Sequence, residues 1–195
     1  MARDNARRLG MIGCGFQAET QLEAVSAVRD LETALVYSRL PERWEGFAKK
    51  MSERLGLAVR AVDSVEEAVS QSEIVTTITT ARKPLFPADV VPQGCHINAA
   101  GSNHAKRAEI GADTVARSAV IAADSIEQAR MEAGDLIQAH EAGVLDWEKV
   151  VDFSAIASGG IAGRKSTDDI TLFESQGLAI QDLMVAAYVY KTIAP

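Results

Sequence analysis

Cysteine is scarce in this chain of 195 residues, which has only two. Cys14 and Cys95 cannot form the dense disulfide framework of a small secreted domain, so a reducing compartment, the cytoplasm, is expected. No apolar run approaches the roughly 18 residues that a membrane span needs, so no membrane partner is expected. Residues 1–8 are polar and basic and lead directly into a short apolar run, which is not the pattern of a signal peptide.

Positive charge is also in deficit, because 20 lysines and arginines face 27 aspartates and glutamates and leave a net charge of −7. Proteins that follow a nucleic-acid backbone need a basic face, so nucleic acid is not an expected partner. Histidine is also scarce, with three residues. His96, His104 and His140 lack the spacing of a ligand set, so no metal site is expected.

Short apolar runs alternate with longer stretches of helical period along most of the chain. This alternation is typical of repeated strand–helix–strand units, which form a parallel sheet with helices on both faces. We therefore predict an α/β fold, a doubly wound parallel sheet of the Rossmann type, as a single dinucleotide-binding domain over residues 1–195. The expected strands cover residues 9–12, 33–37, 57–62, 74–78, 96–99, 119–123 and 170–173.

Local signals mark where several helices begin and end. Ser64 and Ser125 are each followed, three residues later, by a glutamate or a glutamine, which is the spacing of a capping box at a helix start. Gly56 follows the apolar stripe of residues 41–55 and predicts the end of that helix. A last helix is expected at about residues 177–194.

The segment Gly-Cys-Gly-Phe-Gln-Ala at residues 13–18 joins the first expected strand to the first expected helix. It fits the G-x-G-x-x-A pattern in its strand–turn–helix context. Gly13 permits the tight turn, Gly15 lets the backbone approach a pyrophosphate, and Ala18 lets the helix pack closely on the strand. The pattern predicts a dinucleotide site, and the alternative is a plain glycine-rich turn.

Ser38 and Arg39 follow the second expected strand, where NAD-binding domains usually carry an acidic residue. A carboxylate there accepts from the ribose 2′-hydroxyl of NAD, whereas a hydroxyl beside a guanidinium can bind the 2′-phosphate of NADP. The sequence therefore favours NADP(H) over NAD(H). The alternative is that Arg39 is an ordinary solvated charge.

Further motifs follow in a fixed order along the chain. They are LGMIGCG at 9–15 with Gln17 and Ala18, SR at 38–39, IVTTIT at 74–79, HINAAGS at 96–102, DS at 124–125, EAGD at 132–135, GR at 163–164 and DITLFES at 169–175. In this order they resemble the ornithine cyclodeaminase/mu-crystallin family, which includes archaeal-type alanine dehydrogenases and ketimine or iminosuccinate reductases. The resemblance runs nearly from end to end.

The resemblance implies that one crevice holds the cofactor. The implied contacts are Gly13, Gly15, Phe16 and Gln17 along the pyrophosphate, Ser38 and Arg39 at the adenosine ribose, Thr79 and Thr80 beside the middle of the cofactor, and Ala100, Gly101 and Ser175 near the nicotinamide. The two threonines have an alternative role, because strand-end hydroxyls also bond the local backbone.

The resemblance also implies an oxidoreductase for a small amino or imino acid, either an NADP(H)-dependent imine reductase or an amino-acid dehydrogenase. Asn103 stands where cyclodeaminases of this family have a catalytic aspartate, and an amide cannot exchange protons near neutral pH. This departure counts against ornithine cyclodeamination, which stays an alternative, and Asn103 is otherwise a turn residue. No catalytic residue can be assigned from the sequence. A non-catalytic NADP(H)-binding module is a further alternative, for which mu-crystallin is a precedent.

In such enzymes a segment before the Rossmann part supplies most of the substrate and dimer surface, including the residues that hold the substrate carboxylate. Residues 1–8 resemble the run-in to the first Rossmann strand. We therefore expect this chain to be the cofactor part of a longer homodimeric enzyme and to be inactive alone. The helix at about 177–194 is expected to pack toward the substrate and dimer part.

Overall fold

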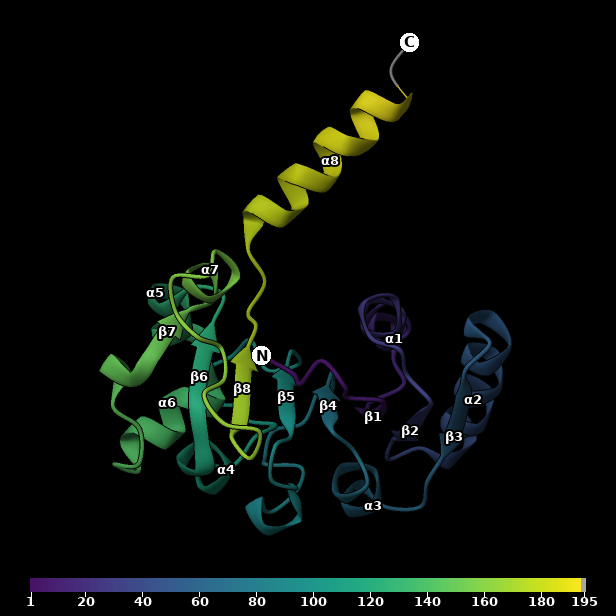
Figure 1. Ribbon diagram of the computed structural model, residues 1–195, viewed down its shortest axis with the longest axis horizontal. Coiled ribbons are helices and arrows are strands. Elements are labelled where there is room, and N and C mark those ends of the chain that lie inside the picture. Colours follow the sequence, from purple (N-terminus) through teal and green to yellow (C-terminus); the bar gives the residue numbers. More distant parts are fainter. Residues whose placement is uncertain (194–195) are drawn as a thin grey trace.

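The computed structural model describes residues 1–193, and residues 194 and 195 lie outside the described range. Its strands form one sheet of eight parallel strands in the order β3-β2-β1-β4-β5-β8-β6-β7 (Figure 1). The strands are β1 (Arg8–Ile12), β2 (Thr33–Tyr37), β3 (Ala58–Ala61), β4 (Ile74–Thr77), β5 (His96–Ala99), β6 (Ser118–Ala123), β7 (Val150–Asp152) and β8 (Ile170–Glu174).

Helices follow most of the strands and cover both faces of the sheet (Figure 1). They are α1 (Phe16–Val28), α2 (Pro41–Leu55), α3 (Val65–Ser70), α4 (Ala112–Arg117), α5 (Ile126–Glu132), α6 (Gly134–Glu141), α7 (Phe153–Ala157) and α8 (Ala179–Ile193), with short 3₁₀ turns at Ala88–Val90 and Trp147–Lys149. The predicted doubly wound Rossmann fold is confirmed.

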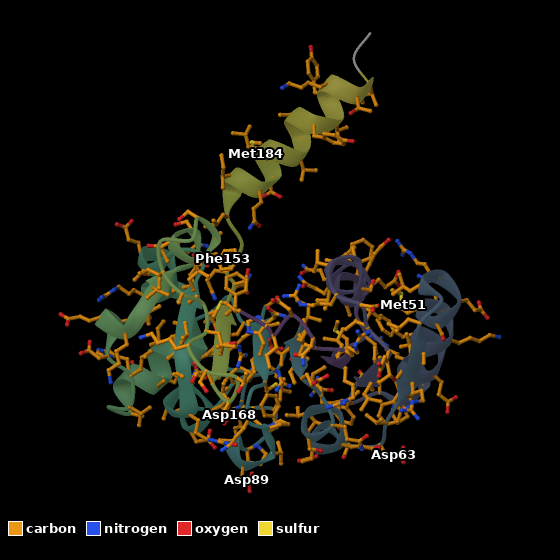
Figure 2. All side chains as sticks on the ribbon, viewed as in Figure 1. Met51, Asp63, Asp89, Phe153, Asp168 and Met184 are labelled. Atoms are coloured by element: carbon orange, nitrogen blue, oxygen red, sulfur yellow. The ribbon has the colours of Figure 1, made fainter. Side chains whose placement is uncertain are left out.

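The core has two parts because successive side chains of a strand point to opposite faces of the sheet. On one face, Leu9 and Met11 of β1 pack with Leu22 of α1 and Met51 of α2, which Figure 2 labels within the α2 layer. On the other face, apolar residues of β4, β5 and β8 pack with those of α3, α4, α5 and α6. Burial of both faces explains why the strands are short apolar runs with little alternation.

The predicted local signals formed as expected. Ser64 Oγ accepts from the Glu67 amide at 3.1 Å, and Ser125 Oγ accepts from the Gln128 amide at 3.3 Å. Gly56 ends α2 in the left-handed conformation, at φ 63°.

Several predictions of strands need correction. The strands expected at 57–62 and 74–78 are shorter, at Ala58–Ala61 and Ile74–Thr77. The strand β7 was not predicted, because its three residues are too few to form an apolar run. The strand expected at 170–173 extends to Glu174, whose backbone is still paired with Ala99 of β5 and Ala123 of β6.

Helix α8 differs from the rest of the molecule because none of its residues is buried. It projects away from the sheet and its covering helices, with Met184 far from the body of the domain (Figures 1 and 2). The predicted helix at 177–194 thus begins at Ala179 and is described to Ile193, and residue 194 lies outside the described range. None of the helices within residues 1–193 has the length and apolar character needed to cross a membrane.

Candidate functional site

The loops after strands β1, β2, β4, β5 and β8 surround one cleft with a volume of about 1020 Å³. Parallel strands all end at the same edge of a sheet, so the loops that follow them converge there. The cleft is lined by all the residues that sequence analysis placed along a cofactor or at its mouth. These are Gly13, Gly15, Phe16, Gln17, Ser38, Arg39, Thr79, Thr80, Ala100, Gly101, Asn103 and Ser175.

The glycine turn between β1 and α1 forms one wall of the cleft. Gly13 has a φ of 115°, and a side chain there would collide with the Ile78 carbonyl oxygen. Gly15 is the N-cap residue of α1 and provides no side-chain cap. A Cβ atom at Gly15 would meet no atom within 4 Å, so this glycine leaves open space in front of the helix. The start of α1 therefore presents its amides and the positive end of its dipole to the cleft, which favours an anionic group.

Arginines gather where β2 ends. Ser38 is half-buried, Arg39 is exposed, and both line the cleft together with Arg43. On the opposite wall, Arg82 and Arg107 join Arg39 around an adjoining side pocket of about 460 Å³. This positive lining, in a protein with a net charge of −7, makes one end of the cleft suited to a phosphate group.

A buried carboxylate supports the middle of the cleft. Glu109 accepts from the Thr79 amide at 2.6 Å, from the Gly101 amide at 2.8 Å and from Thr77 Oγ1 at 2.8 Å. Thr79 Oγ1 also donates to Glu109 and accepts from the Ala81 amide, so its hydroxyl has the local bonding role that the sequence left open. Burial raises the pKa of Glu109, and the hydrogen bonds from the two threonines oppose that rise.

A second acidic residue fixes the turn after β8. Asp124, which follows β6, accepts through Oδ2 from Ser175 Oγ at 3.1 Å and from the amides of Gln176 and Gly177 at 2.9 and 2.8 Å. Ser175, Gln176 and Gly177 all line the cleft. The Ser175 hydroxyl is thus held by a neighbouring carboxylate.

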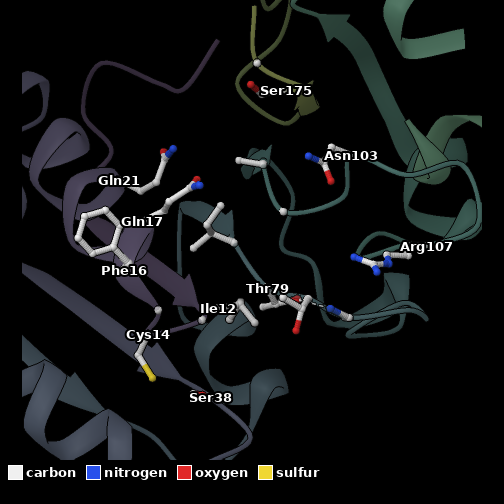
Figure 3. A pocket seen from close by; sticks show the side chains of 18 of the residues that line it. Ile12, Cys14, Phe16, Gln17, Gln21, Ser38, Thr79, Asn103, Arg107 and Ser175 are labelled. Carbon is white, nitrogen blue, oxygen red and sulfur yellow. Dashed lines mark hydrogen bonds between the residues drawn. The ribbon is translucent and has the colours of Figure 1, made fainter. Parts of the chain in front are cut away.

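Asn103 and Arg107 lie on the wall of the cleft that faces Gln17 and Gln21 of α1 (Figure 3). Asn103 is exposed, whereas Arg107 is half-buried, and its carbonyl oxygen accepts from Ser102 Oγ at 3.0 Å. The Arg107 guanidinium points into the pocket in Figure 3. An amide at Asn103 can donate and accept hydrogen bonds, but it cannot act as an acid or a base.

Sequence reasoning did not single out the acids Glu109, Asp124, Asp135 and Glu174, or Arg107. Glu109 lies between the buried residues Ala108 and Ile110, and a lone acid among apolar neighbours was a signal that could have been used. Asp124, Asp135 and Glu174 stood only within quoted motifs. Within residues 1–193, no group of three or more His, Cys, Asp or Glu residues is placed to hold a metal ion.

The profile of the ornithine cyclodeaminase/mu-crystallin family matches residues 1–194. The chain belongs to this family. Among curated family relatives, a Δ¹-pyrroline-2-carboxylate reductase of Bacillus cereus is 36% identical over 98% of this chain and 59% of its own length.

Two solved structures of relatives extend this likeness to the fold. The Δ¹-pyrroline-2-carboxylate reductase of Thermococcus litoralis, in complex with NADH and L-proline, has a TM-score of 0.95 and 38% identity over 98% of this chain and 59% of its own. An archaeal alanine dehydrogenase dimer with bound NAD has a TM-score of 0.90 and 35% identity over 98% of this chain and 58% of its own. This chain therefore spans somewhat more than half the length of the relatives it matches.

Proposed function

We propose that this chain binds NADP(H) along the cleft and is the cofactor-binding part of a reductase for small cyclic imino acids. The observation that carries the proposal is the cleft itself, which joins the open glycine turn of α1 to Arg39 at the end of β2. The reductases of similar sequence support the substrate class, because they are named for the cyclic imino acid Δ¹-pyrroline-2-carboxylate.

The residues present fit a dinucleotide cofactor. The space in front of Gly15 and the free start of α1 suit a pyrophosphate, which carries negative charge and needs a close backbone approach. The nicotinamide, when bound, supplies the hydride that reduces a C=N bond. The protein's own task is to hold the walls of the cleft in place.

Arg39 supports the choice of NADP(H) over NAD(H). No acidic residue follows Tyr37 at the end of β2, and Arg39, Arg82 and Arg107 together line the side pocket. Guanidinium groups bind phosphate through charge-assisted hydrogen bonds, whereas they gain little from a ribose hydroxyl.

Asn103 supports imine reduction over cyclodeamination. Its exposed amide lies on the cleft, where it can bond a substrate group but cannot exchange a proton. We infer that the groups that bind the substrate carboxylate belong to the substrate and dimer part of the family enzymes. The exposed apolar side chains of α8, among them Leu183, Met184 and Val189, suit packing against that part.

Cofactor titrations test the proposal directly. We expect the wild type to bind NADPH about ten- to a hundredfold more tightly than NADH, and Arg39→Ala to lose most of that difference while its affinity for NADH is kept. Arg60→Ala, an exposed arginine on β3 outside the cleft lining, is the matched control. Equal affinities of the wild type for the two cofactors would refute the NADP(H) assignment.

A turnover assay separates the enzyme from a non-catalytic module. The chain alone is expected to bind cofactor without reducing imino acids, and to reduce Δ¹-pyrroline-2-carboxylate when a family N-terminal segment is supplied. Ammonia release from ornithine, measured in parallel, is expected to be the slower reaction. Cofactor binding with no turnover in either arrangement would favour the non-catalytic binding module.

A further inference from the structure

Two acidic side chains meet in the dry interior beneath the cleft. Asp135, the second residue of α6, and Glu174, the last residue of β8, are 1% and 0% exposed, and each has a buried carboxyl oxygen without a hydrogen-bond partner in residues 1–193. Two ionised carboxylates have no hydrogen to share, because both groups only accept. A hydrogen bond between them therefore requires a proton on one of the two.

The remaining contacts of the two side chains locate that proton. Asp135 Oδ1 accepts from the backbone amides of Glu109 and Ile110, and Glu174 Oε1 accepts from Gln176 Nε2 at 3.0 Å. The other oxygens, Asp135 Oδ2 and Glu174 Oε2, are buried, and neither has a hydrogen-bond partner within residues 1–193. These are the two oxygens left to share a proton between the carboxyls.

The charged groups that face this pair favour a bound proton. Glu109 lies on the segment before α4 and adds negative charge, while Asp124 holds the same turn after β8 from the end of β6. Burial raises the pKa of Glu174 well above its usual range, and the charge of Asp135 raises it further. Burial also raises the pKa of Asp135, against the opposing effect of the two amides that it accepts from.

The pair joins two walls of the cleft. On one side, Asp135 holds the amide of Glu109, whose carboxylate bonds the cleft-lining amides of Thr79 and Gly101. On the other side, Glu174 accepts from the side chain of Gln176, which also lines the cleft. A link between Asp135 and Glu174 therefore fixes the turn after β8 relative to the loops after β4 and β5.

We propose that Asp135 and Glu174 share one proton and that this proton makes Glu174 a positioning residue for the end of the cleft where the nicotinamide binds. The effect on cofactor rests on the proposed function, whereas the shared proton does not. Loss of the proton at alkaline pH places two charges in one dry site, and their repulsion separates the two walls. Cofactor affinity then falls although Glu174 does not line the cleft.

The first measurement is infrared difference spectroscopy of the whole chain near neutral pH. A band of a protonated carboxyl group is expected in the wild type and is expected to be absent in Glu174→Gln. The glutamine side chain keeps the size of glutamate and donates to Asp135 without a titratable proton. Absence of the band in the wild type would overturn the proposal, whether or not any cofactor binds.

The second measurement is the pH profile of NADPH affinity. The wild type is expected to bind at least about fivefold more weakly at about pH 9.5 than at about pH 7, and Glu174→Gln is expected to bind equally at both. Glu174→Ala is expected to bind about tenfold more weakly throughout. Asp135→Asn, which still accepts the two amides and donates to Glu174, provides the same test if Glu174→Gln does not fold.

The possible failures can be distinguished. A wild type that shows the carboxyl band but binds neither cofactor refutes the proposed function and leaves the shared proton standing. A wild type that binds cofactor with the same pH profile as Glu174→Gln and Asp135→Asn refutes the positioning role.

Discussion

The two ends of the neighbouring strands β5 and β8 carry buried titratable groups of opposite kinds. At the amino ends, His96 Nδ1 lies 2.8 Å from Thr171 Oγ1, and its Nε2 lies 3.0 Å from Asn98 Oδ1. At the carboxyl ends, Glu174 is completely buried beside Asp135. Burial lowers the pKa of His96 to about 3, whereas burial raises the pKa of Glu174 well above its usual range.

His96 and the buried acids differ in their hydrogen-bond partners. His96 bonds to side chains of its own strand and of β8, so both ring nitrogens are satisfied inside the sheet. The acids at the carboxyl ends of the strands accept hydrogen bonds from the backbone of loops that line the cleft. Glu109 accepts two of these bonds, from the amides of Thr79 and Gly101. A buried polar group that bonds only within the sheet indicates a structural role. A buried polar group that bonds the backbone of loops lining a cleft indicates a functional site.

The largest expected effect is at Glu109. Replacing it with alanine leaves the part-buried amides of Thr79 and Gly101 and the buried Thr77 hydroxyl without an acceptor, so we expect the free energy of unfolding to fall by about 3–5 kcal/mol. Urea unfolding measures this loss. Glu109→Gln should also destabilise the fold, because its amide nitrogen would face donors, and a loss below about 1 kcal/mol in both variants would contradict the role given to Glu109.

The next effect compares the two glycines of the turn after β1. Gly13→Ala places a side chain against the Ile78 carbonyl at a φ of 115°, so we expect it to lower the free energy of unfolding by about 2–3 kcal/mol. Gly15→Ala meets no atom and should change stability by less than about 0.5 kcal/mol while it weakens cofactor binding. Thermal unfolding and NADPH titration of both variants test this difference. Equal losses of stability in the two variants would contradict it.

The smallest expected effect is at His96, at the amino ends of β5 and β8, and it depends on pH. Burial lowers the pKa of His96 to about 3 in the folded chain, from an ordinary value of 6.5. Below about pH 6.5 the histidine of the unfolded chain therefore binds a proton, whereas the histidine of the folded chain does not. This group should therefore cost about 2 kcal/mol of stability between about pH 7 and pH 5. The raised pKa values of Glu109, Asp135 and Glu174 act oppositely, since their contribution is complete at acid pH and is lost as pH rises.

Unfolding of His96→Gln across the same range isolates the histidine. The variant is expected to lose less stability than the wild type on acidification, by about that amount, whatever its stability at neutral pH. Identical slopes in the two proteins would show that His96 is not the group that titrates.

The sequence predicted those features that depend on neighbouring residues. The turn at Gly13 and Gly15, the helix starts at Ser64 and Ser125 and the apolar strands each involve only a short segment, and each formed as expected. The candidate cofactor residues that the family resemblance implied also line one cleft, because strand ends in a parallel sheet converge.

The acid cluster could not be predicted in the same way. Glu109 and Asp135 are 26 residues apart, and Glu174 lies further along the chain, so only the completed sheet brings them together. Glu109 alone had a local signal, its apolar neighbours, whereas Asp135 resembles a surface charge and Glu174 lay just beyond the strand expected at 170–173. Its burial depends on β8 lying between β5 and β6, which no local pattern encodes.

The position of β8 also has a consequence for how the molecule is made. This strand is the last of the sheet to leave the ribosome, yet it alone joins β5 to β6. During synthesis, the part of the sheet from β3 to β5 can form early. Until β8 pairs, β6 and β7 are not joined to it, and the edges of β5 and β6 lack hydrogen-bonding partners. Closure of the sheet is therefore a late, long-range event, and the edges of β5 and β6 stay open to aggregation until β8 pairs with them.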